Sequence, residues 1–565
     1  MTISSKLATS KLSIFIGVTA VIVSCFYWTG GTDPVNLPKF FALTTLVSAL
    51  IGFFFSFGLS VVNEISAALK VLTLVFIGSI CVPLFFSTGP ISHQLFGVSG
   101  RNTGLVTYIA LCFLMLITST LRGDNRIKIV ICLLISGCVA MMISVFELLG
   151  ANLLHTTGTF QALIGPFGNP NFISAFMGIV GASTLVIISQ PSVTKGTLMY
   201  AFPILLFSIF INYHTHAKQG IVVLVFGAIL AILFRLHFGV KKNWLTSLFF
   251  IGSSLVGVLG LLGLQNKGPL SSLVYKSSVS FREEYWAAGI NMLNKFPMTG
   301  VGLSSYGDWY RALRTPSALA NPGVDVTTNV SHNVFIDFGA NGGWPLLAST
   351  VSIFVLALFA GLKYLKQLKT YDVTFLVILV AWLGYVLQAM ISIDQIGLAV
   401  WGWVLTGALI SYGAIISSSN ETSKTKNARG NTKSKIATPS VGIGQYALSA
   451  FGLLLGLVIA LPVFNADLRW GQALEAGNST LLRSAAVAWP LDESRVGNAA
   501  YIYMQNKMYP QAKEMIELGI QEFPRSFSIW RLLYQLPSAT KEEKVKALER
   551  LRFLDPNNET LKSLT

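Results

Sequence analysis

The longest polar stretch between two apolar runs covers residues 279–344 and reads VSFREEYWAAGINMLNKFPMTGVGLSSYGDWYRALRTPSALANPGVDVTTNVSHNVFIDFGANGGW. Arg282 stands near its start, in a segment of amphipathic pattern, and His332 stands near its end. Pro297 and Gly300 predict turns between them. Because a rigid scaffold can position a loop without burying its backbone, loops often carry function. We therefore expect the chemistry of this chain in this stretch.

The composition of the whole chain is that of a membrane protein. Of the 565 residues, 53% are hydrophobic and 11% are charged, whereas soluble domains carry about 25% charged residues. The net charge of +16 comes mainly from Lys and Arg in short loops between apolar runs. That pattern is typical of cytoplasmic loops and not of a nucleic-acid-binding face. The sequence therefore predicts an all-α fold, a polytopic bundle of membrane helices, with the lipid bilayer as a partner and no nucleic acid.

The apolar runs are long enough for about thirteen transmembrane helices of roughly 20 residues each. With the N-terminus inside, every strongly basic short loop falls on the cytoplasmic side. The stretch 279–344 and everything after Phe464 then fall on the outer side. The expected spans lie near residues 12–29, 39–60, 67–87, 103–121, 127–149, 171–189, 197–213, 219–236, 245–265, 343–363, 373–393, 397–416 and 444–464.

We expect four parts along the chain. The first is a membrane domain that holds a large outer loop at residues 266–342. A disordered, basic cytoplasmic linker follows, then the last transmembrane helix, then an extracytoplasmic helical domain. In order, these parts cover residues 1–416, 417–443, 444–464 and 465–565.

The last hundred residues carry a weak repeat. Pro490, Pro524 and Pro556 are 34 and 32 residues apart, close to the period of tetratricopeptide repeats. Two such helix pairs are few for a solenoid, so we expect them to lean on the last span or on the outer loops. They form either a helical cap without a ligand or a docking surface for a partner protein or an acceptor substrate. The positions expected to pack are Ala499, Ala500, Tyr503, Tyr509, Ala512, Ile516 and Ile520.

Metal chemistry has little support in the sequence. All five cysteines fall within apolar runs, which argues against disulfides in the outer parts and against a cysteine metal site. His214 and His216 form a His-x-His pair, but no further His or carboxylate cluster accompanies them. We predict no metal and no cofactor.

The other outer loops offer candidate substrate-binding residues. Arg101 lies at the start of the fourth span, where an arginine can also be a simple interface anchor. Asn169 and Asn171 flank a proline at the start of the sixth span, where a turn and an N-cap explain them equally well. Lys218, at the outer end of a helix, is a plausible phosphate contact.

Within the large loop, Arg282 and His332 are the candidates for chemistry. A guanidinium matches the oxygens of a diphosphate with a fork of donors and stays charged. A histidine in the same cleft could take a proton from an attacking hydroxyl. Either residue alone is weak evidence, since a single histidine at a loop end is more often a hydrogen-bonding residue.

Four segments in order resemble the superfamily of O-antigen ligases and O-antigen polymerases, which includes bacterial protein O-oligosaccharyltransferases. FGVSGRNTG at 96–104 resembles its Gly-Arg-x-x-Gly loop, and GPFGNPNF at 165–172 resembles its Asn-Pro-Asn turn. SFREEYWAAGINMLNKFPMTGVG at 280–302 resembles its Arg-x-x-x-Trp segment, which runs to Pro-x-x-Gly-x-Gly. SHNVFIDFGANGG at 331–343 resembles its His-Asn motif, with a glycine eleven residues after the histidine.

Two departures from the family pattern stand out. A second glycine expected after the His-Asn motif is Leu346 here. The frequent Ser-Arg-Gly after the seventh span is replaced by a sequence that starts at Lys218. A second arginine for the donor is therefore not fixed at that position, and Lys218, Arg101, Arg311 or Arg314 could take its place.

The resemblance implies an inverting, metal-independent glycosyltransferase at the outer face of the bacterial plasma (inner) membrane. The donor would be a glycan on polyprenyl (undecaprenyl) diphosphate, and the acceptor a hydroxyl of lipid A core, of a glycan or of a protein Ser/Thr. Arg282 would hold the diphosphate with Lys218 or Arg101, and His332 would orient or deprotonate the acceptor. Asn333 would fix the loop beside His332.

Two other classes of function stay open at this point. A lipid-linked oligosaccharide flippase or another polysaccharide exporter would also be polytopic, but such transporters tend to show internal repeats and charges at mid-membrane depth. This sequence shows no repeat between its halves and few mid-span charges. A non-catalytic scaffold would use the C-terminal helices, and Arg282 and His332 would then be incidental.

Overall fold

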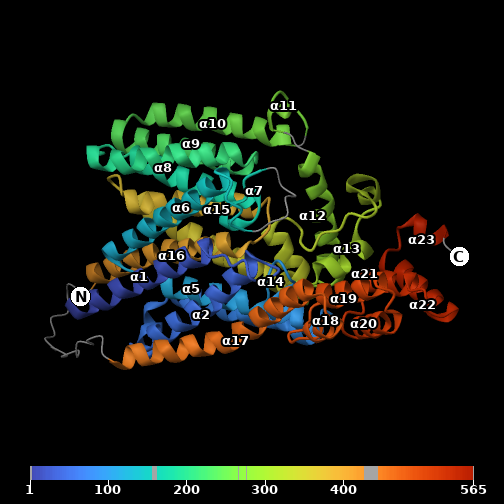
Figure 1. Ribbon diagram of the computed structural model, residues 1–565. Helices are drawn as coiled ribbons and strands as arrows, with labels where there is room; N and C mark the ends of the chain where they lie inside the picture. Colours follow the sequence, from blue (N-terminus) through green and yellow to red (C-terminus); the bar gives the residue numbers. More distant parts are fainter. Residues whose placement is uncertain (1–2, 155–161, 265, 275–276, 425–442, 564–565) are drawn as a thin grey trace.

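The protein is an all-helical membrane bundle with a smaller helical region at one end (Figure 1). The computed structural model describes residues 3–154, 162–264, 266–274, 277–424 and 443–563. Within those residues there are helices and no strands. The predicted linker at 417–443 lies for the most part outside them. Its first residues, up to Lys424, continue the helix that precedes it.

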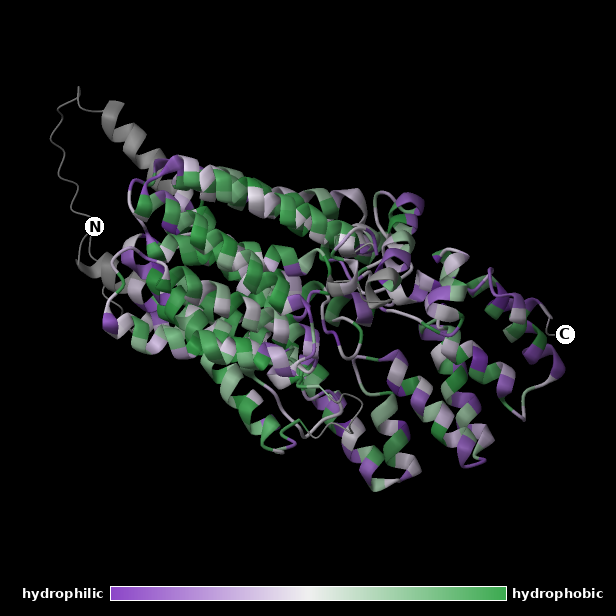
Figure 2. Cartoon of the chain, turned by 90° about the horizontal axis from the view of Figure 1, so that it is seen from above, coloured by the Kyte–Doolittle hydropathy of each residue, from purple (hydrophilic) through white to green (hydrophobic). Residues whose placement is uncertain are grey.

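The predicted polytopic bundle is confirmed. Among the described residues, ten helices are long and apolar enough to cross a membrane, and three shorter apolar helices accompany them at the remaining predicted spans. In Figure 2 the ribbon of this larger part of the molecule is coloured mostly as hydrophobic. The helices are α1 (Ile3–Cys25), α2 (Asn36–Phe55), α3 (Ala67–Phe86), α5 (Leu105–Thr118), α6 (Ile127–Leu148), α7 (Pro170–Ile188), α8 (Lys195–His214), α9 (Gln219–Phe234), α10 (Asn243–Leu264), α14 (Val334–Gln367), α15 (Val373–Ala389), α16 (Ile396–Lys424) and α17 (Ile443–Ala476).

Successive apolar helices run between two ends of the bundle, and hydrogen bonds join the turns at each end. At one end, Arg126 at the start of α6 donates to the Ser411 hydroxyl near the end of the apolar part of α16 (2.7 Å). At the other end, Asn333 before α14 donates to the Met390 carbonyl after α15 (2.8 Å). The large loop therefore shares an end with the turn between α15 and α16, and the basic turn before α6 lies at the opposite end.

A close approach of two backbones joins α17 to α2. A Cβ atom at Gly452 would lie 2.2 Å from the Ser48 carbonyl oxygen, and one at Gly52 would lie 2.1 Å from the Leu448 carbonyl oxygen. Gly456 faces α2 one turn further along α17. Small residues four apart allow membrane helices to approach this closely. The glycine seam, consisting of Gly52, Gly452 and Gly456, therefore depends on the absence of side chains.

The predicted large outer loop is mostly helical. It contains α11 (Ser271–Val274), α12 (Ser277–Lys295) and α13 (Tyr306–Leu313), and α14 begins at Val334, nine residues before the predicted span. Asn333 causes this early start because its side chain caps the helix by accepting from the backbone N–H groups of Phe335 and Ile336. The shorter pieces are α4 (Ile91–Phe96), the 3-10 turns Leu59–Glu64, Gly123–Arg126 and Gly165–Phe167, and the π turns Arg235–Val240 and Leu319–Gly323.

After the last span, α17 continues to Ala476 as one helix, twelve residues beyond the predicted end. It leads into helices that pack in pairs around their own core. Ala499, Ala500 and Ala512 are fully buried there, as expected of the packing positions. The helices are α18 (Ser479–Ala486), α19 (Glu493–Gln505), α20 (Tyr509–Glu522), α21 (Phe527–Gln535), α22 (Lys541–Leu554) and α23 (Glu559–Ser563).

The C-terminal helices lean on the large loop. Arg314, after α13, donates two hydrogen bonds to the Asp555 carboxylate after α22 (2.9 and 2.7 Å), and both side chains are fully buried. Arg311 adds a second ion pair with Asp555 (3.0 Å). In Figure 1 the C-terminal helices accordingly lie beside α12 and α13 at one end of the bundle.

Candidate functional site

The helix α12 presents Arg282, Tyr285 and Trp286 on one face, because residues three and four apart are neighbours on a helix. Arg282 is half-buried. No described residue makes a hydrogen bond or an ion pair with its guanidinium, and burial lowers its pKa. A guanidinium keeps its charge even so. Arg282 is therefore a charged group whose donors remain available to a ligand.

His332 packs against that same face of α12. Its ring stacks on the ring of Tyr285, with centroids 5.3 Å apart and an interplanar angle of 28°. Trp286 donates its indole N–H to the His332 carbonyl (3.4 Å). The backbone of His332 has a φ of 58°, which is uncommon for a residue other than glycine. Such conformations persist where the surroundings hold them, and they cluster at functional sites.

The turn around His332 is held from both sides. The carboxylate of Asp337 accepts from the backbone N–H of Ser331 (2.8 Å), and the hydroxyl of Ser331 donates to the Asn333 carbonyl (2.8 Å). Asn333 caps α14 and also donates to Met390. These hydrogen bonds of Asn333 hold the loop next to His332 against α14 and the turn after α15.

Two arginines act on His332 electrostatically. The positive charges of Arg282 and Arg101, together with burial, lower the pKa of His332 from 6.5 to about 4, with burial the largest cause. Arg101 is itself half-buried and lies in the field of Asp337. The structure thus brings together Arg282, Arg101 and His332 from three separate segments. At neutral pH the imidazole is uncharged, and one ring nitrogen can accept a proton.

Two glycines of the motifs bring the turn after α12 against α14. Gly343 has a φ of 72° inside α14 and breaks the helix there. A Cβ atom at Gly343 would lie 2.5 Å from the Pro297 carbonyl oxygen, and one at Gly300 would lie 2.3 Å from the Asn341 carbonyl carbon. Both positions require glycine, because a side chain would push the two segments apart. The break separates the first turns of α14, which follow the His332 loop directly, from the rest of the helix.

A buried carboxylate lies in the field of Asp337. Asp394, in the turn between α15 and α16, accepts from the Tyr385 hydroxyl (3.0 Å). Burial raises the pKa of Asp394 to about 7, and the charge of Asp337 adds to the shift. Nothing in the sequence pattern singled out this aspartate, because a carboxylate near the end of a span is common at a membrane interface.

Asn169, Asn171 and Lys218 lie at another part of the same end of the bundle. Asn169 caps α7 by accepting from the backbone N–H of Asn171 (2.9 Å), so the predicted N-cap is confirmed. Neither asparagine is hydrogen-bonded to His332 within the described residues. Lys218 precedes α9, where the Gly220 backbone N–H donates to Ser174 of α7 (2.9 Å). The structure therefore groups Lys218 with the α7 turn.

Arg311 is placed differently from the other predicted contacts. Its guanidinium pairs with Asp555, and it stacks over the Phe527 ring, 4.2 Å from the centroid. Both partners belong to the C-terminal helices. Arg311 is therefore part of the contact between the loop and the C-terminal helices, and no described contact joins it to His332.

Metal-ligand side chains come together at a different part of the chain from the His-x-His pair. Within the described chain, His214 and His216 belong to no group of three or more metal-ligand side chains. One such group does occur, formed by His93, Asp308 and Glu493. It lies between the membrane domain and the C-terminal helices, and none of its described hydrogen bonds or ring contacts reaches His332.

Sequence reasoning missed three residues of this site. Tyr285 and Trp286 support His332 from α12, and their spacing from Arg282 was the available signal. Asp337 lies in the first turn of α14, where acidic residues are usual. Its bond to Ser331 depends on the turn geometry, which has no signature in the sequence.

A comparison with protein families gives one match relevant to this geometry. Residues 203–351 match the family model described as O-antigen ligase. The match begins in α8, includes α12 with Arg282, and ends in α14 after the His332 turn and the Gly343 break. A search of curated proteins found no match.

Proposed function

We propose that this chain is a membrane glycosyltransferase of cell-surface polysaccharide biosynthesis, because its residues 203–351 match the family model described as O-antigen ligase. The donor is a glycan on a polyprenyl diphosphate, and the acceptor is a hydroxyl group of lipid A core, of a glycan or of a protein Ser/Thr. The observation that supports this most is the approach of two arginines to one uncharged histidine, on a scaffold of apolar helices.

In the proposed reaction the acceptor oxygen attacks the anomeric carbon as its bond to the diphosphate oxygen breaks, with inversion. The leaving polyprenyl diphosphate takes the electron pair of that bond, and the acceptor proton goes to the free ring nitrogen of His332. Arg282 and Arg101 stabilise the charge that develops on the diphosphate. No step uses a metal ion.

The low pKa of His332 suits this order of events. In the free protein burial, and to a smaller extent the fields of Arg282 and Arg101, make the imidazole a weak base. A bound diphosphate brings negative charge between the arginines and offsets those fields, which raises the pKa of His332. The base thus gains strength when the donor is present.

The outer face of the plasma membrane is the proposed side of transfer. The His332 turn and the C-terminal helices share one end of the bundle, and the basic turn before α6 lies at the other end. Basic short loops favour the cytoplasmic side. The polyprenyl tail would lie along the apolar helices.

The first test is a transfer assay with purified protein in vesicles. The reaction receives a polyprenyl-diphosphate-linked glycan and candidate acceptors in buffer without added metal, and released polyprenyl diphosphate is measured. We expect His332→Ala and Arg282→Ala each to lower kcat by about 100-fold or more, the scale of lost acid–base or oxyanion-type stabilisation. Added Mg²⁺ or Mn²⁺ should leave the rate unchanged.

Matched controls are available on the same elements. Glu283→Ala changes the exposed neighbour of Arg282 on α12, and His237→Ala removes an exposed histidine at the other end of the bundle. Both should transfer normally. Arg101→Ala should cost more activity than Lys218→Ala if Arg101 is the second donor cation. Normal transfer by His332→Ala would refute the proposed role of His332.

A further inference from the structure

The side chains of His93, Asp308 and Glu493 come from three distant parts of the chain. His93 belongs to α4 in the membrane domain, Asp308 to α13 in the large loop, and Glu493 to the first turn of α19 in the C-terminal helices. One ligand atom of each lies within 4.8 Å of the others. The three meet where the C-terminal helices lean on the rest of the molecule.

His93 is the observation that points to a ligand. It is 2% exposed, and neither of its ring nitrogens has a hydrogen-bond partner. Its ring stacks on Phe523, with centroids 5.2 Å apart and an interplanar angle of 25°, which fixes its plane. Buried polar groups in native proteins are almost always bonded, so an unpaired buried imidazole requires an explanation. A metal ion bound to one ring nitrogen would supply the missing partner.

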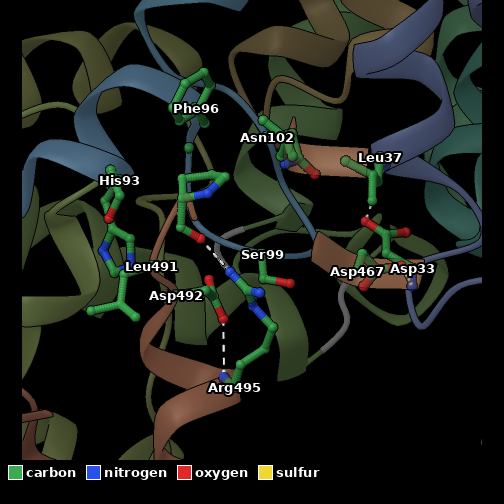
Figure 3. A pocket seen from close by; sticks show the side chains of 14 residues that line it. Asp33, Leu37, His93, Phe96, Ser99, Asn102, Asp467, Leu491, Asp492 and Arg495 are labelled. Carbon is green, nitrogen blue, oxygen red and sulfur yellow. Dashed lines mark hydrogen bonds between the residues drawn. The ribbon is translucent and has the colours of Figure 1, made fainter. Parts of the chain in front are cut away.

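The pocket that His93 lines is built by the membrane domain and the C-terminal helices together. Figure 3 shows His93 near Leu491, with Asp492 and Arg495 of the α19 region on the same pocket wall. A neighbouring cleft is lined by His93, Asp308 and Glu493 and also by Ser304 and Tyr501. That cleft gives a hydrated ion access to all three side chains.

The surroundings of the Asp308 and Glu493 carboxylates favour the binding of a cation. Ser526 and Ser528 both donate to one oxygen of Glu493, which orients the side chain and leaves the other oxygen without a described partner. No described residue donates to the Asp308 carboxylate. Burial and the charge of Glu493 raise the pKa of Asp308. A cation would offset this repulsion.

Arg525 is the competing partner for these carboxylates. Its positive charge lowers the pKa of Asp308, but its Nε donates to the Asp308 backbone carbonyl (3.2 Å). Its guanidinium lies over the Trp309 ring, 3.4 Å from the centroid. These contacts hold Arg525 beside the cluster. It does not donate to either carboxylate within the described residues.

We propose that His93, Asp308 and Glu493 bind one divalent transition-metal ion, of the Zn²⁺ or Mn²⁺ class, that joins the C-terminal helices to the large loop and to α4. One imidazole with two carboxylates suits this class, whereas an all-oxygen set would favour Mg²⁺ or Ca²⁺. Ligand atoms of a tetrahedral Zn²⁺ site lie about 3.4 Å apart, so a small side-chain movement completes the site. Water fills the remaining positions.

The metal is structural in this proposal, and its ligands are separate from the residues proposed for transfer. Binding releases the proton of Asp308 when that carboxyl is protonated, and it requires an uncharged His93. Affinity should therefore fall as pH is lowered. Failure of the transferase proposal would leave this inference standing, and the reverse also holds.

The test is metal binding by the purified full-length protein in detergent. Protein stripped with EDTA is exposed to Zn²⁺, Mn²⁺ or Mg²⁺, and the bound metal is measured by mass spectrometry after gel filtration. We expect about one Zn²⁺ or Mn²⁺ per chain, no retained Mg²⁺, and a rise in the thermal unfolding midpoint with the retained metal. The single variants Glu493→Gln, Asp308→Asn and His93→Ala should each bind at least about 10-fold more weakly.

Two controls keep the result specific. His237→Ala removes an exposed histidine and Glu514→Gln an exposed carboxylate outside the cluster, and both should bind metal as the unchanged protein does. If stripped protein retains no metal, or if the three ligand variants retain it normally, the proposal is wrong. If no metal binds and Asp308→Asn and Arg525→Gln lower the midpoint equally, the cluster is an ion pair only.

Discussion

At the scale of single residues, the surroundings of His332 predict an unusual pH dependence. The histidine has a pKa of about 4 in the folded protein, so it stays uncharged where an ordinary histidine is protonated. We expect kcat/KM for the donor, measured from about pH 4.5 to 8, to show no acid limb near 6.5. With saturating donor, the acid limb of kcat should lie at higher pH, because the diphosphate offsets the arginine charges.

A variant sharpens this prediction. In Arg282→Lys a positive charge remains but the planar fork is lost, so we expect a large fall in kcat with little movement of the acid limb in kcat/KM. A limb at about 6.5 in the unchanged protein would contradict the assigned surroundings of His332. The same pKa also affects stability. Between about pH 6.5 and 4 only the unfolded chain takes up this proton, so the free energy of unfolding decreases as pH falls.

Single residues also show what the sequence could reveal about the site. Arg282 and His332 were predictable because charged residues in a long polar stretch are rare in a membrane chain. The choice of second cation was not. Arg101, Arg311 and Lys218 look equivalent in the sequence, and only the fold shows that Arg311 faces Asp555 while Arg101 acts on His332.

At the scale of elements, the glycine seam between α2 and α17 predicts a sharp effect of one side chain. Gly452→Val would place a methyl-bearing carbon 2.2 Å from the Ser48 carbonyl oxygen, well inside van der Waals contact. We expect a loss of at least about 1–3 kcal/mol, the range of overpacking, seen as a lower thermal midpoint in detergent. Gly257→Val, on α10 where a Cβ would meet no atom within 4 Å, is the matched control.

Helices could be predicted from the sequence where hydropathy determines their position in the chain. The apolar runs predict the apolar helices of the bundle, ten of which within the described residues are long enough to cross a membrane, because a span must satisfy its own backbone bonds and bury apolar length. The helices α14 and α17 extend beyond the predicted spans, α14 at its start and α17 at its end, because an N-cap and tertiary packing set these two ends, and not hydropathy. The Gly452-x-x-x-Gly456 spacing was visible in the sequence and was the signal for the seam.

At the scale of the whole molecule, the large loop and the C-terminal helices depend on each other. Arg314 and Asp555 are fully buried, and removing one partner of such a pair costs about 3–5 kcal/mol because the other charge stays buried. The sequence predicts that the last hundred residues lean on another part of the protein. It cannot identify Asp555 as the partner, because no local pattern links residues about 240 positions apart.

Because α17 packs against α2 through the glycine seam, we expect that the chain connection between residues 424 and 443 is not needed to hold the two parts of the molecule together. The part after residue 442 is attached by backbone contact in the bilayer and by the buried Arg314–Asp555 pair, at opposite ends of its length. Two separately translated pieces, 1–424 and 443–565, should therefore reassemble when co-expressed and should co-purify through a tag on either one. With Gly452→Val and Asp555→Ala combined in the second piece, we expect co-purification to fail. If the two unchanged pieces do not co-purify, this prediction is wrong, and the chain connection between them is needed for their association.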